Sequence, residues 1–394
     1  MLESPVTASL SPVPFLQDLI RTPSMPGEEA QIAARVLEEM RKLGFDDAWT
    51  DAKGNAFGLY RGTERGPAWM LMTHLDHIDV GDLSLWEHPP FAAVLENAGF
   101  ENACVHGRGA VDIKGQLATH IYTVANMIAR GLRPKRDIVV TAPVFEEIGG
   151  EGAEYMCKHL PLQTPDGSSI SFGACIVAEP SSNRVMLGHR GVSRATVSFH
   201  GEAHHASFGL YDKNPHFALG KFLERLSKFT MPTHPVLGSS SISPTVIHAD
   251  TVSNNLTPNR IDLVLDWRTT SETGDDVRQI LRDLTEGLPA TFESYDDWHS
   301  GPGGLKQPGF YTPATHPLVQ ALQAAVLEKN PNAPEPGIWQ FATDGRHTQA
   351  AGIPTVGFGP GDATLAHTTR ERIEVAEMTW HMEVLEKFLL EHTP

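Results

Sequence analysis

The chain has 394 residues, and about 150 residues per domain would divide it into two or three domains. Its 40% hydrophobic and 20% charged residues are typical of a globular protein with a sizeable core. The 31 basic and 48 acidic residues give a formal net charge of −17, and such an acidic surface disfavours binding to nucleic acids or anionic membranes.

The cysteines and the N-terminal segment indicate a reducing compartment. Cys104, Cys157 and Cys175 are widely spaced and form no CxxC pair, which disfavours both a disulfide framework and a thiolate zinc site. Residues 1–17 lack the basic start and apolar core of a signal peptide, and no apolar stretch of about 18 residues follows. We therefore expect a cytoplasmic protein with reduced thiols.

Helices and strands alternate over the first half of the chain. The hydrophobic periodicity predicts helices over 28–43, 114–129 and 151–160 and strands over 55–60, 68–73, 137–145 and 174–178. Such alternation predicts an α/β fold with a parallel or mixed sheet that is covered on both faces.

The pattern changes near residue 188. Strands are expected over 192–200, 243–248 and 261–267, with helices over 217–229 and 275–284, which together form a small α+β unit. After a Gly- and Pro-rich loop over 300–313 the first pattern returns, with a helix over 317–329, a strand over 354–358 and a final helix over 374–390. We predict an α+β domain of residues 188–300 inserted into a larger α/β domain of residues 1–187 and 301–394.

Acidic and imidazole side chains follow the predicted buried strands. The candidates are His74 and Asp76, Asp112, Glu146 and Glu147, Glu179, and His367 after the glycine-rich turn 357–361. Each is weak evidence alone, but the carboxyl ends of strands in an open α/β sheet meet at one edge. Carboxylates gathered there would raise one another's pKa unless cations were present, and two cations suit this number of ligands. Imidazole and carboxylate without thiolate favour zinc, with cobalt or manganese as alternatives.

Two pairs of neighbouring residues suggest a division of roles. Asp76 is placed to accept a hydrogen bond from the second ring nitrogen of His74, which would fix the tautomer of a metal ligand. Adjacent side chains on an extended segment point in opposite directions, so one of Glu146 and Glu147 could bind metal while the other faces a water molecule as general base.

Taken together, these segments resemble the M20 metallopeptidases, a family that includes deacetylases, desuccinylases, aminoacylases and glutamate carboxypeptidases. The resemblance implies a three-layer catalytic domain of zinc-peptidase type with an inserted lid and dimerisation domain. Residue by residue, the resemblance implies that His74 and Glu179 hold one metal ion and that Glu147 and His367 hold the other. It implies that Asp112 bridges the two ions. It further implies that Asp76 orients His74 and that Glu146 is the general base.

The resemblance also extends to the inserted unit. His205 matches the lid histidine that reaches the active site of a partner subunit in a homodimer, and the adjacent His204 is the alternative. Asn255 and Arg268 match substrate-contacting residues, and an ordinary salt bridge is the alternative for Arg268. The stretches 254–258 and 339–345 depart from the family pattern near the substrate pocket. The resemblance therefore does not imply that this protein acts on the same substrate as the best-known members of the family.

These observations predict an enzyme that hydrolyses the amide bond of a small N-acyl amino acid or peptide. Dipeptidase and carboxypeptidase activities share the same core site. A serine hydrolase is disfavoured because no Gly-x-Ser-x-Gly elbow occurs. The other alternative is a non-catalytic binding protein on the same scaffold, which is disfavoured because all five ligands and Glu146 are present.

Overall fold

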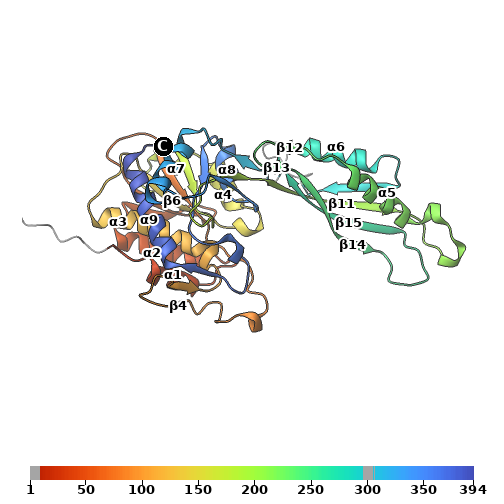
Figure 1. Cartoon of the computed structure of the whole chain (residues 1–394), viewed down its shortest axis with the longest axis horizontal. Coiled ribbons are helices and arrows are strands. Elements are labelled where there is room, and N and C mark those ends of the chain that lie inside the picture. Colours follow the sequence, from red (N-terminus) through yellow and green to blue (C-terminus); the bar gives the residue numbers. More distant parts are fainter. Residues whose placement is uncertain (1–8, 296–304, 306) are drawn as a thin grey trace, which may run out of the picture. The chain divides into compact units, whose positions relative to one another are not determined.

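The computed structural model describes residues 9–295, 305 and 307–394, which fall into two compact units (Figure 1). The first unit comprises Met1–Gly188, Thr312–Trp339 and Thr343–Pro394, and the second comprises His189–Tyr311 and Gln340–Ala342. The first segment of the first unit ends at residue 188, where the inserted domain was predicted to begin. The other predicted boundary, between residues 300 and 301, lies outside the described residues.

A mixed sheet forms the centre of the first unit. Its strands are β1 (Asp47–Thr50), β2 (Ala56–Tyr60), β6 (Ile138–Ala142), β3 (Ala68–Met72), β9 (Phe172–Val177), β19 (Thr355–Gly357) and β10 (Met186–His189), in this spatial order, with β18 (Gly337–Trp339) beside β10. The neighbours β6, β3, β9 and β19 are parallel, whereas β1, β2 and β10 pair antiparallel. Every residue of β2, β3 and β6 is buried, as expected for a sheet covered on both faces.

Helices cover both faces of this sheet. They are α1 (Val13–Ile20), α2 (Ala30–Leu43), α3 (Gly115–Ala129), α4 (Glu151–Lys158), α7 (Pro317–Lys329), α8 (Gly345–Ala350) and α9 (Val375–Glu391). Trp69 of β3 packs edge-on against Phe388 of α9 with 5.1 Å between ring centroids. Cys175 of β9 is in register with the residue that follows Trp69 on β3, and Cys175 contacts Thr348 of α8. Successive strand residues point to opposite faces, so α9 and α8 lie on opposite sides and the predicted three-layer α/β fold is confirmed.

Smaller elements were not predicted from the sequence. A three-stranded sheet has the order β20-β5-β4, with β4 (Val94–Glu96), β5 (Cys104–His106) and β20 (Arg372–Glu374), and a hairpin joins β7 (Leu162–Gln163) to β8 (Ser169–Ile170). Strands of two or three residues carry too little periodicity to be recognised. Among the helices of the described residues, none has both the length and the apolar character needed to cross a bilayer.

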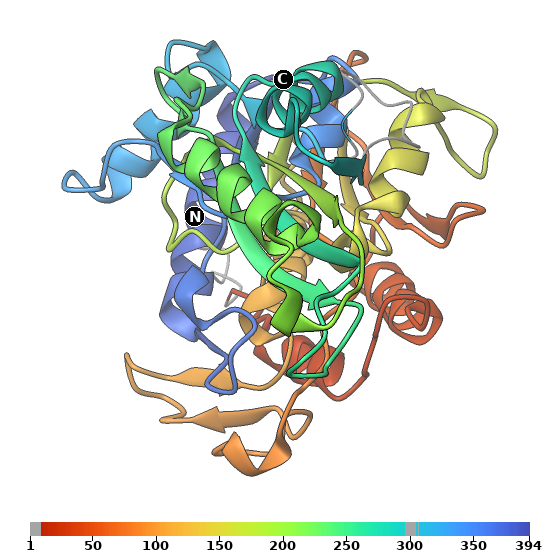
Figure 2. The same ribbon diagram turned by 90° about the vertical axis from the view of Figure 1, so that its right-hand side faces the viewer.

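The second unit is an antiparallel sheet with two helices on one face. The strand order is β14-β15-β11-β16, with β14 (Ser241–Ala249), β15 (Arg260–Thr269), β11 (Gly191–His200) and β16 (Ala290–Ser294). Figure 2 shows α5 (Pro215–Lys228) and α6 (Gly274–Thr285) side by side on this sheet. Short strands β12 (Thr233–His234), β13 (Gly238–Ser239) and β17 (Phe310–Tyr311) complete the unit. Its core includes Phe199 and Phe222, whose rings meet edge-on, so the predicted α+β character is confirmed.

The strand that precedes His74 depends on Trp69, which is almost fully buried. We expect Trp69→Ala to lower the free energy of unfolding of the first unit by about 3–5 kcal/mol, because a large cavity would remain under α9. Trp49→Ala is the matched control, since Trp49 stacks on Phe57 from an edge strand and is only partly buried. Denaturant unfolding followed by circular dichroism measures both, and equal losses would contradict this account.

Candidate functional site

Adjacent parallel strands of the first unit bring the predicted ligands to one edge of its sheet. His74 follows β3, Glu146 and Glu147 follow β6, and Glu179 is the second residue after β9. His367 lies on the loop after β19. Because these four strands are parallel neighbours, their carboxyl ends lie together at the edge where ligands collect in open α/β sheets.

Asp112 joins these side chains from a separate segment. It lies within Ala110–Lys114, directly before α3. Its Oδ1 atom is 3.3 Å from Nε2 of His74, and its Oδ2 atom is 3.2 Å from Nε2 of His367. Nε2 of His74 is 3.6 Å from Oε1 of Glu179, and Nε2 of His367 is 3.2 Å from Oε2 of Glu147. The five predicted ligands therefore form two groups that share one carboxylate.

The donor atoms suit a pair of divalent cations. One donor atom each from His74, Asp112 and Glu147 lie within 4.8 Å of one another. Within the described part of the chain, the buried Oδ1 atom of Asp112 makes no hydrogen bond, although buried carboxylate oxygens are normally satisfied. Imidazole and carboxylate ligands without thiolate are those that zinc, cobalt and manganese accept. The residues present thus fit the ions implied by the sequence.

Burial and mutual repulsion act on the carboxylates. Burial raises the pKa of Glu179 well above its usual value, and the nearby carboxylates of Asp112 and Glu147 raise it further against the opposing effect of His74. Burial likewise raises the pKa of Glu147, and the neighbouring Asp112 adds to the shift. Burial and the neighbouring negative charges therefore both disfavour the ionised forms of these two glutamates.

The pKa values of the two imidazoles are raised as well. Burial lowers the pKa of His74, but its interactions with Asp112 and Asp76 outweigh burial and raise the pKa well above its usual value. Interactions with Asp112 and Glu147 raise the pKa of His367 to about 10. Both shifts have one cause, which is the excess of carboxylates around two imidazoles.

Asp76 fixes the geometry of three neighbouring residues. Nδ1 of His74 donates a hydrogen bond of 3.1 Å to the carbonyl oxygen of Asp76, which leaves Nε2 facing Asp112. The two carboxylate oxygens of Asp76 accept hydrogen bonds from the backbone N–H groups of Glu146 and Glu147, at 3.1 and 3.0 Å. The second role was not foreseen from the sequence.

The local conformation of the glutamate pair differs from the prediction. Glu146–Ile148 forms a 3-10 turn instead of an extended segment, so the argument from side chains pointing in opposite directions was wrong. Phe145 before the turn has φ 62°, a conformation uncommon for residues other than glycine. The turn presents the N–H groups of both glutamates to the single carboxylate of Asp76. In an extended segment, these two N–H groups would point to opposite sides.

Asp344 is a buried carboxylate to which the sequence analysis gave no role. Within the described residues neither of its oxygens makes a hydrogen bond, and Nη2 of Arg346 lies 3.4 Å from Oδ1. Burial raises the pKa of Asp344 to about 6, while Arg346 lowers it. Gly150 permits this arrangement, because it has φ 73° and a Cβ atom there would lie 2.2 Å from Oδ1 of Asp344.

Asp344 also affects the predicted base. Burial raises the pKa of Glu146 well above its usual value, and the charge of Asp344 is the next largest cause. The only signal in the sequence was the position of Asp344 within the stretch 339–345 that departs from the family pattern.

Glu371 is a second buried carboxylate that the sequence analysis missed. Its Oε1 atom accepts hydrogen bonds of 3.1 Å from the backbone N–H groups of Val111 and Asp112, and its Oε2 atom pairs with the buried Arg108. Burial raises the pKa of Glu371 to about 7, while Arg108 lowers it. Glu371 therefore holds the backbone of Asp112 from a point 259 residues away in the sequence, a separation at which no local motif could reveal the contact.

The predicted lid residues belong to the second unit. The imidazole of His205 is exposed, with Nδ1 2.8 Å from Oγ of Ser207. Nδ1 of the neighbouring His204 lies 2.9 Å from Oγ1 of Thr257, and His204 is more buried. Asn255 lies beside His205, because the carbonyl oxygen of Asn255 accepts a hydrogen bond of 2.9 Å from the N–H group that follows His205.

Arg268 has an intramolecular partner. Its Nε atom donates a hydrogen bond of 2.8 Å to Oδ1 of Asp266, two residues earlier on β15, and its side chain remains partly exposed. This pair is the salt bridge that was considered as the alternative to a substrate contact. Such a pair leaves guanidinium N–H groups for another acceptor, because arginine has five donors.

The comparisons with known proteins agree with the fold and with the chemistry of the site. The sequence profile of peptidase family M20/M25/M40 matches residues 70–391. Succinyl-diaminopimelate desuccinylase of Halorhodospira halophila is 28% identical over 379 residues, which cover 92% of this chain and 93% of that protein. The uncharacterized protein YgeY of Escherichia coli is 27% identical over 375 residues, covering 91% of this chain and 88% of that protein.

Solved structures share the fold at low sequence identity. A tripeptidase from Staphylococcus aureus has a TM-score of 0.75 at 17% identity, covering 96% of this chain and 97% of that one. A dinuclear metal-binding M20 peptidase from Bacillus subtilis has a TM-score of 0.69 at 15% identity, covering 96% of each chain. Because the family profile matches most of the sequence, this chain belongs to peptidase family M20/M25/M40, as its motifs predicted.

Proposed function

We propose that the protein is a two-metal hydrolase that cleaves the amide bond of a small N-acyl amino acid or short peptide. The single observation that carries this proposal is the position of Asp112, whose two oxygens face His74 on one side and His367 on the other. Two cations held by a shared carboxylate are typical of hydrolytic centres that activate water.

The ligands divide into two sets in this proposal. His74 and Glu179 would hold one ion, Glu147 and His367 would hold the other, and Asp112 would be shared by both. Ions at these positions would polarise the scissile carbonyl group and lower the pKa of the attacking water. Zinc is the ion we propose, because it accepts this ligand set, and cobalt and manganese are the alternatives for the metal analysis.

Glu146 is the proposed general base. Its carboxyl group lies beside the ligand cluster without being assigned to either ion, and burial together with Asp344 raises its pKa. A carboxylate of raised pKa is a better acceptor for the proton of the attacking water, and it can then donate that proton to the leaving amine. Asp76 supports this role by holding the backbone of Glu146.

We further propose a cytoplasmic homodimer in which the second unit is the lid and the dimer interface. His205 of one protomer would stabilise the oxyanion in its partner, and its exposed imidazole suits that role better than His204, which is held by Thr257. The edge strand β14 exposes Val246 and Ile247, which are 42% and 57% accessible. An apolar, unpaired edge of this kind is normally covered by another chain.

The substrate class rests on the relatives and is open to a direct screen. A desuccinylase and a tripeptidase are among the proteins similar to this chain. We propose an N-acyl amino acid as the substrate, with a dipeptidase or carboxypeptidase activity as the alternative. Hydrolysis of N-acetyl and N-succinyl amino acids and of dipeptides by the zinc-loaded protein separates these activities. Full metal loading without turnover of any of them would favour a non-catalytic binding protein.

Replacing the base tests the mechanism. We expect Glu146→Gln to lower kcat by about 10²–10⁴-fold, because the amide cannot accept the proton of the water. Metal content, measured by elemental analysis, should remain that of the wild type. Glu154→Gln on α4 is the control, since Glu154 pairs with Lys158 on the helix surface, and it should retain full activity. Full turnover by metal-loaded Glu146→Gln would show that another group is the base.

Asp76 offers a test of metal binding that does not rely on turnover. We expect Asp76→Asn to weaken metal affinity by about 10–100-fold, because the asparagine nitrogen cannot accept the N–H group of Glu146 or Glu147. Competition with a chromogenic chelator measures the affinity. Asp79→Asn makes the same change three residues later, at an exposed carboxylate that accepts only from Gly81, and should leave the affinity unchanged.

Arg268 distinguishes a substrate contact from a lid salt bridge. If Arg268 binds the substrate carboxylate, Arg268→Ala should lower kcat/KM by about tenfold to a hundredfold, mainly by raising KM. Arg260→Ala is a closely matched control, because Arg260 on the same strand also pairs with an aspartate two residues away, Asp262. Equal, small effects of the two substitutions would assign Arg268 to the salt bridge with Asp266.

A further inference from the structure

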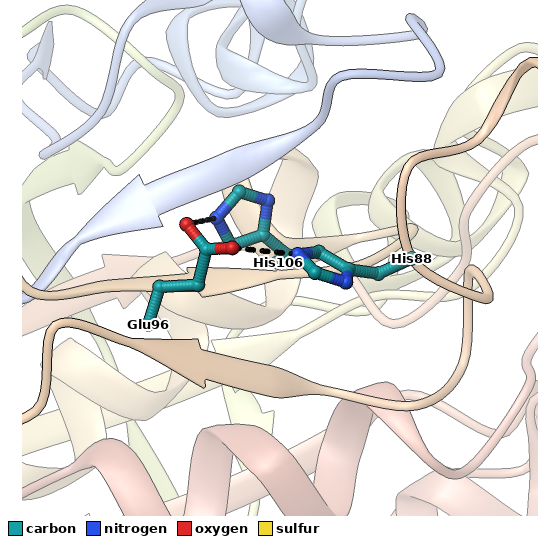
Figure 3. A group of neighbouring side chains, drawn as sticks. All are labelled: His88, Glu96 and His106. Carbon is teal, nitrogen blue, oxygen red and sulfur yellow. Dashed lines mark hydrogen bonds and ion pairs between the residues drawn. The ribbon is translucent and has the colours of Figure 1, made fainter.

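A second cluster of metal-binding side chains lies in the first unit and shares no residue with the proposed catalytic centre. Figure 3 shows the carboxylate of Glu96 facing the imidazole rings of both His88 and His106, with a dashed line to each. Oε1 of Glu96 is 2.8 Å from Nε2 of His88, and Oε2 is 3.1 Å from Nε2 of His106. The two rings meet edge-on with 4.9 Å between their centroids. Both imidazoles thus direct the same ring atom to one carboxylate.

A cysteine adjoins this cluster. Sγ of Cys104 is 3.2 Å from Nε2 of His106, and the side chain of Cys104 is buried. Cys104 and His106 are two residues apart on β5, so they point to the same face, and Glu96 of β4 is directly opposite Cys104 in the antiparallel register. His88 completes the group from the loop before β4. The strand pairing therefore sets the positions of three of the four side chains.

We infer that His88, Glu96 and His106 bind a second, non-catalytic transition-metal ion of the zinc class, with Cys104 as the fourth donor. One donor atom each from His88, Glu96 and His106 lie within 4.8 Å of one another, and this group and the catalytic ligands are the two such groups in the described residues. Two imidazoles, a carboxylate and a thiol form a donor set that zinc and cobalt prefer and that magnesium and calcium do not.

The spacing and the charges are compatible with tetrahedral binding. Bonds of 2.0–2.3 Å to zinc place two donors about 3.3–3.6 Å apart. The separations of 2.8 Å between His88 and Glu96 and of 3.1 Å between Glu96 and His106 would each change by less than about 1 Å on binding. Sγ of Cys104 lies outside the compact group formed by these three side chains, so its side chain would have to turn toward the ion. Glu96 and Glu374 place two negative charges near Cys104 against the single positive charge of Arg372, so the net local charge is negative, which favours a cation. Burial raises the pKa of Cys104, so binding of an ion would release the thiol proton.

The position of this cluster suggests what the ion would do. β5 is followed directly by Gly107 and Arg108, and Arg108 pairs with Glu371, which holds the backbone of Asp112. An ion that joins His88 to β4 and β5 would therefore order the segment that leads into the catalytic centre. It would act as a structural ion and would touch neither substrate nor water in the reaction.

Metal stoichiometry tests the inference. The full chain is loaded with excess zinc, the free metal is removed by gel filtration, and the ions retained per chain are counted by elemental analysis. We expect His88→Ala to retain one ion fewer per chain than the wild type. His216→Ala, which changes an exposed histidine of α5 whose Nδ1 atom lies 2.8 Å from Oδ1 of Asn214, should retain the wild-type number. Equal stoichiometry of His88→Ala and wild type would overturn the inference. Since the readout is a difference between variants, it is independent of whether the catalytic centre is correctly assigned.

Cobalt provides a second readout that needs no variant. A thiolate bound to cobalt(II) gives an intense sulfur-to-metal charge-transfer absorption in the near ultraviolet, and the proposed catalytic centre contains no thiol. We expect this absorption in the cobalt-loaded wild type, its loss in Cys104→Ser and its retention in Cys157→Ser, since Cys157 lies on α4. Its absence from the cobalt-loaded wild type would overturn the role of Cys104 as the fourth donor.

Discussion

Concentrated negative charge at the carboxyl edge of the parallel strands is the constraint on which the site depends. Asp112, Glu147 and Glu179 meet there with only two imidazoles, and Glu146 and Asp344 add to the field. Burial would make such a group costly if it remained uncompensated. The raised pKa values of the glutamates and of the imidazoles are two expressions of this excess. A pair of divalent cations, as proposed above, would offset this excess of negative charge without added protons.

Two further buried carboxylates, those of Asp76 and Glu371, hold this group in place by accepting hydrogen bonds from backbone N–H groups. Asp76 accepts the N–H groups of Glu146 and Glu147, and Glu371 accepts that of Asp112. Backbone N–H donors fix the main chain more rigidly than side-chain contacts would, because they leave no rotamer freedom between donor and Cα. Ligands on short turns are thereby held almost as firmly as ligands on strands.

The general architecture and the meeting of the five candidate ligands at one edge of the sheet could be predicted from the sequence because both depend on local patterns. Long apolar runs marked the parallel strands, and His74, Glu147 and Glu179 follow such runs, whereas Asp112 precedes a helix and was assigned as a ligand by the resemblance. The short turn at Glu146 was mispredicted because its geometry is imposed by Asp76, which lies 70 residues away. Glu371 and Asp344 were missed because their importance arises from burial and from contacts with distant segments, which hydrophobic periodicity does not encode. The lid residues stay predictions, since their role depends on a second protomer.

The link between Glu371 and Asp112 has a consequence for the order in which the molecule is made. The segment around Asp112 leaves the ribosome long before residues 367–371, and the entire second unit is synthesised in between. Until then Asp112 lacks both its backbone anchor and the imidazole of His367. The central sheet can begin to assemble from the early strands, but β19 and His367 are synthesised only after the second unit. The five acidic and imidazole side chains can therefore gather only after both flanking parts of the first unit have been made.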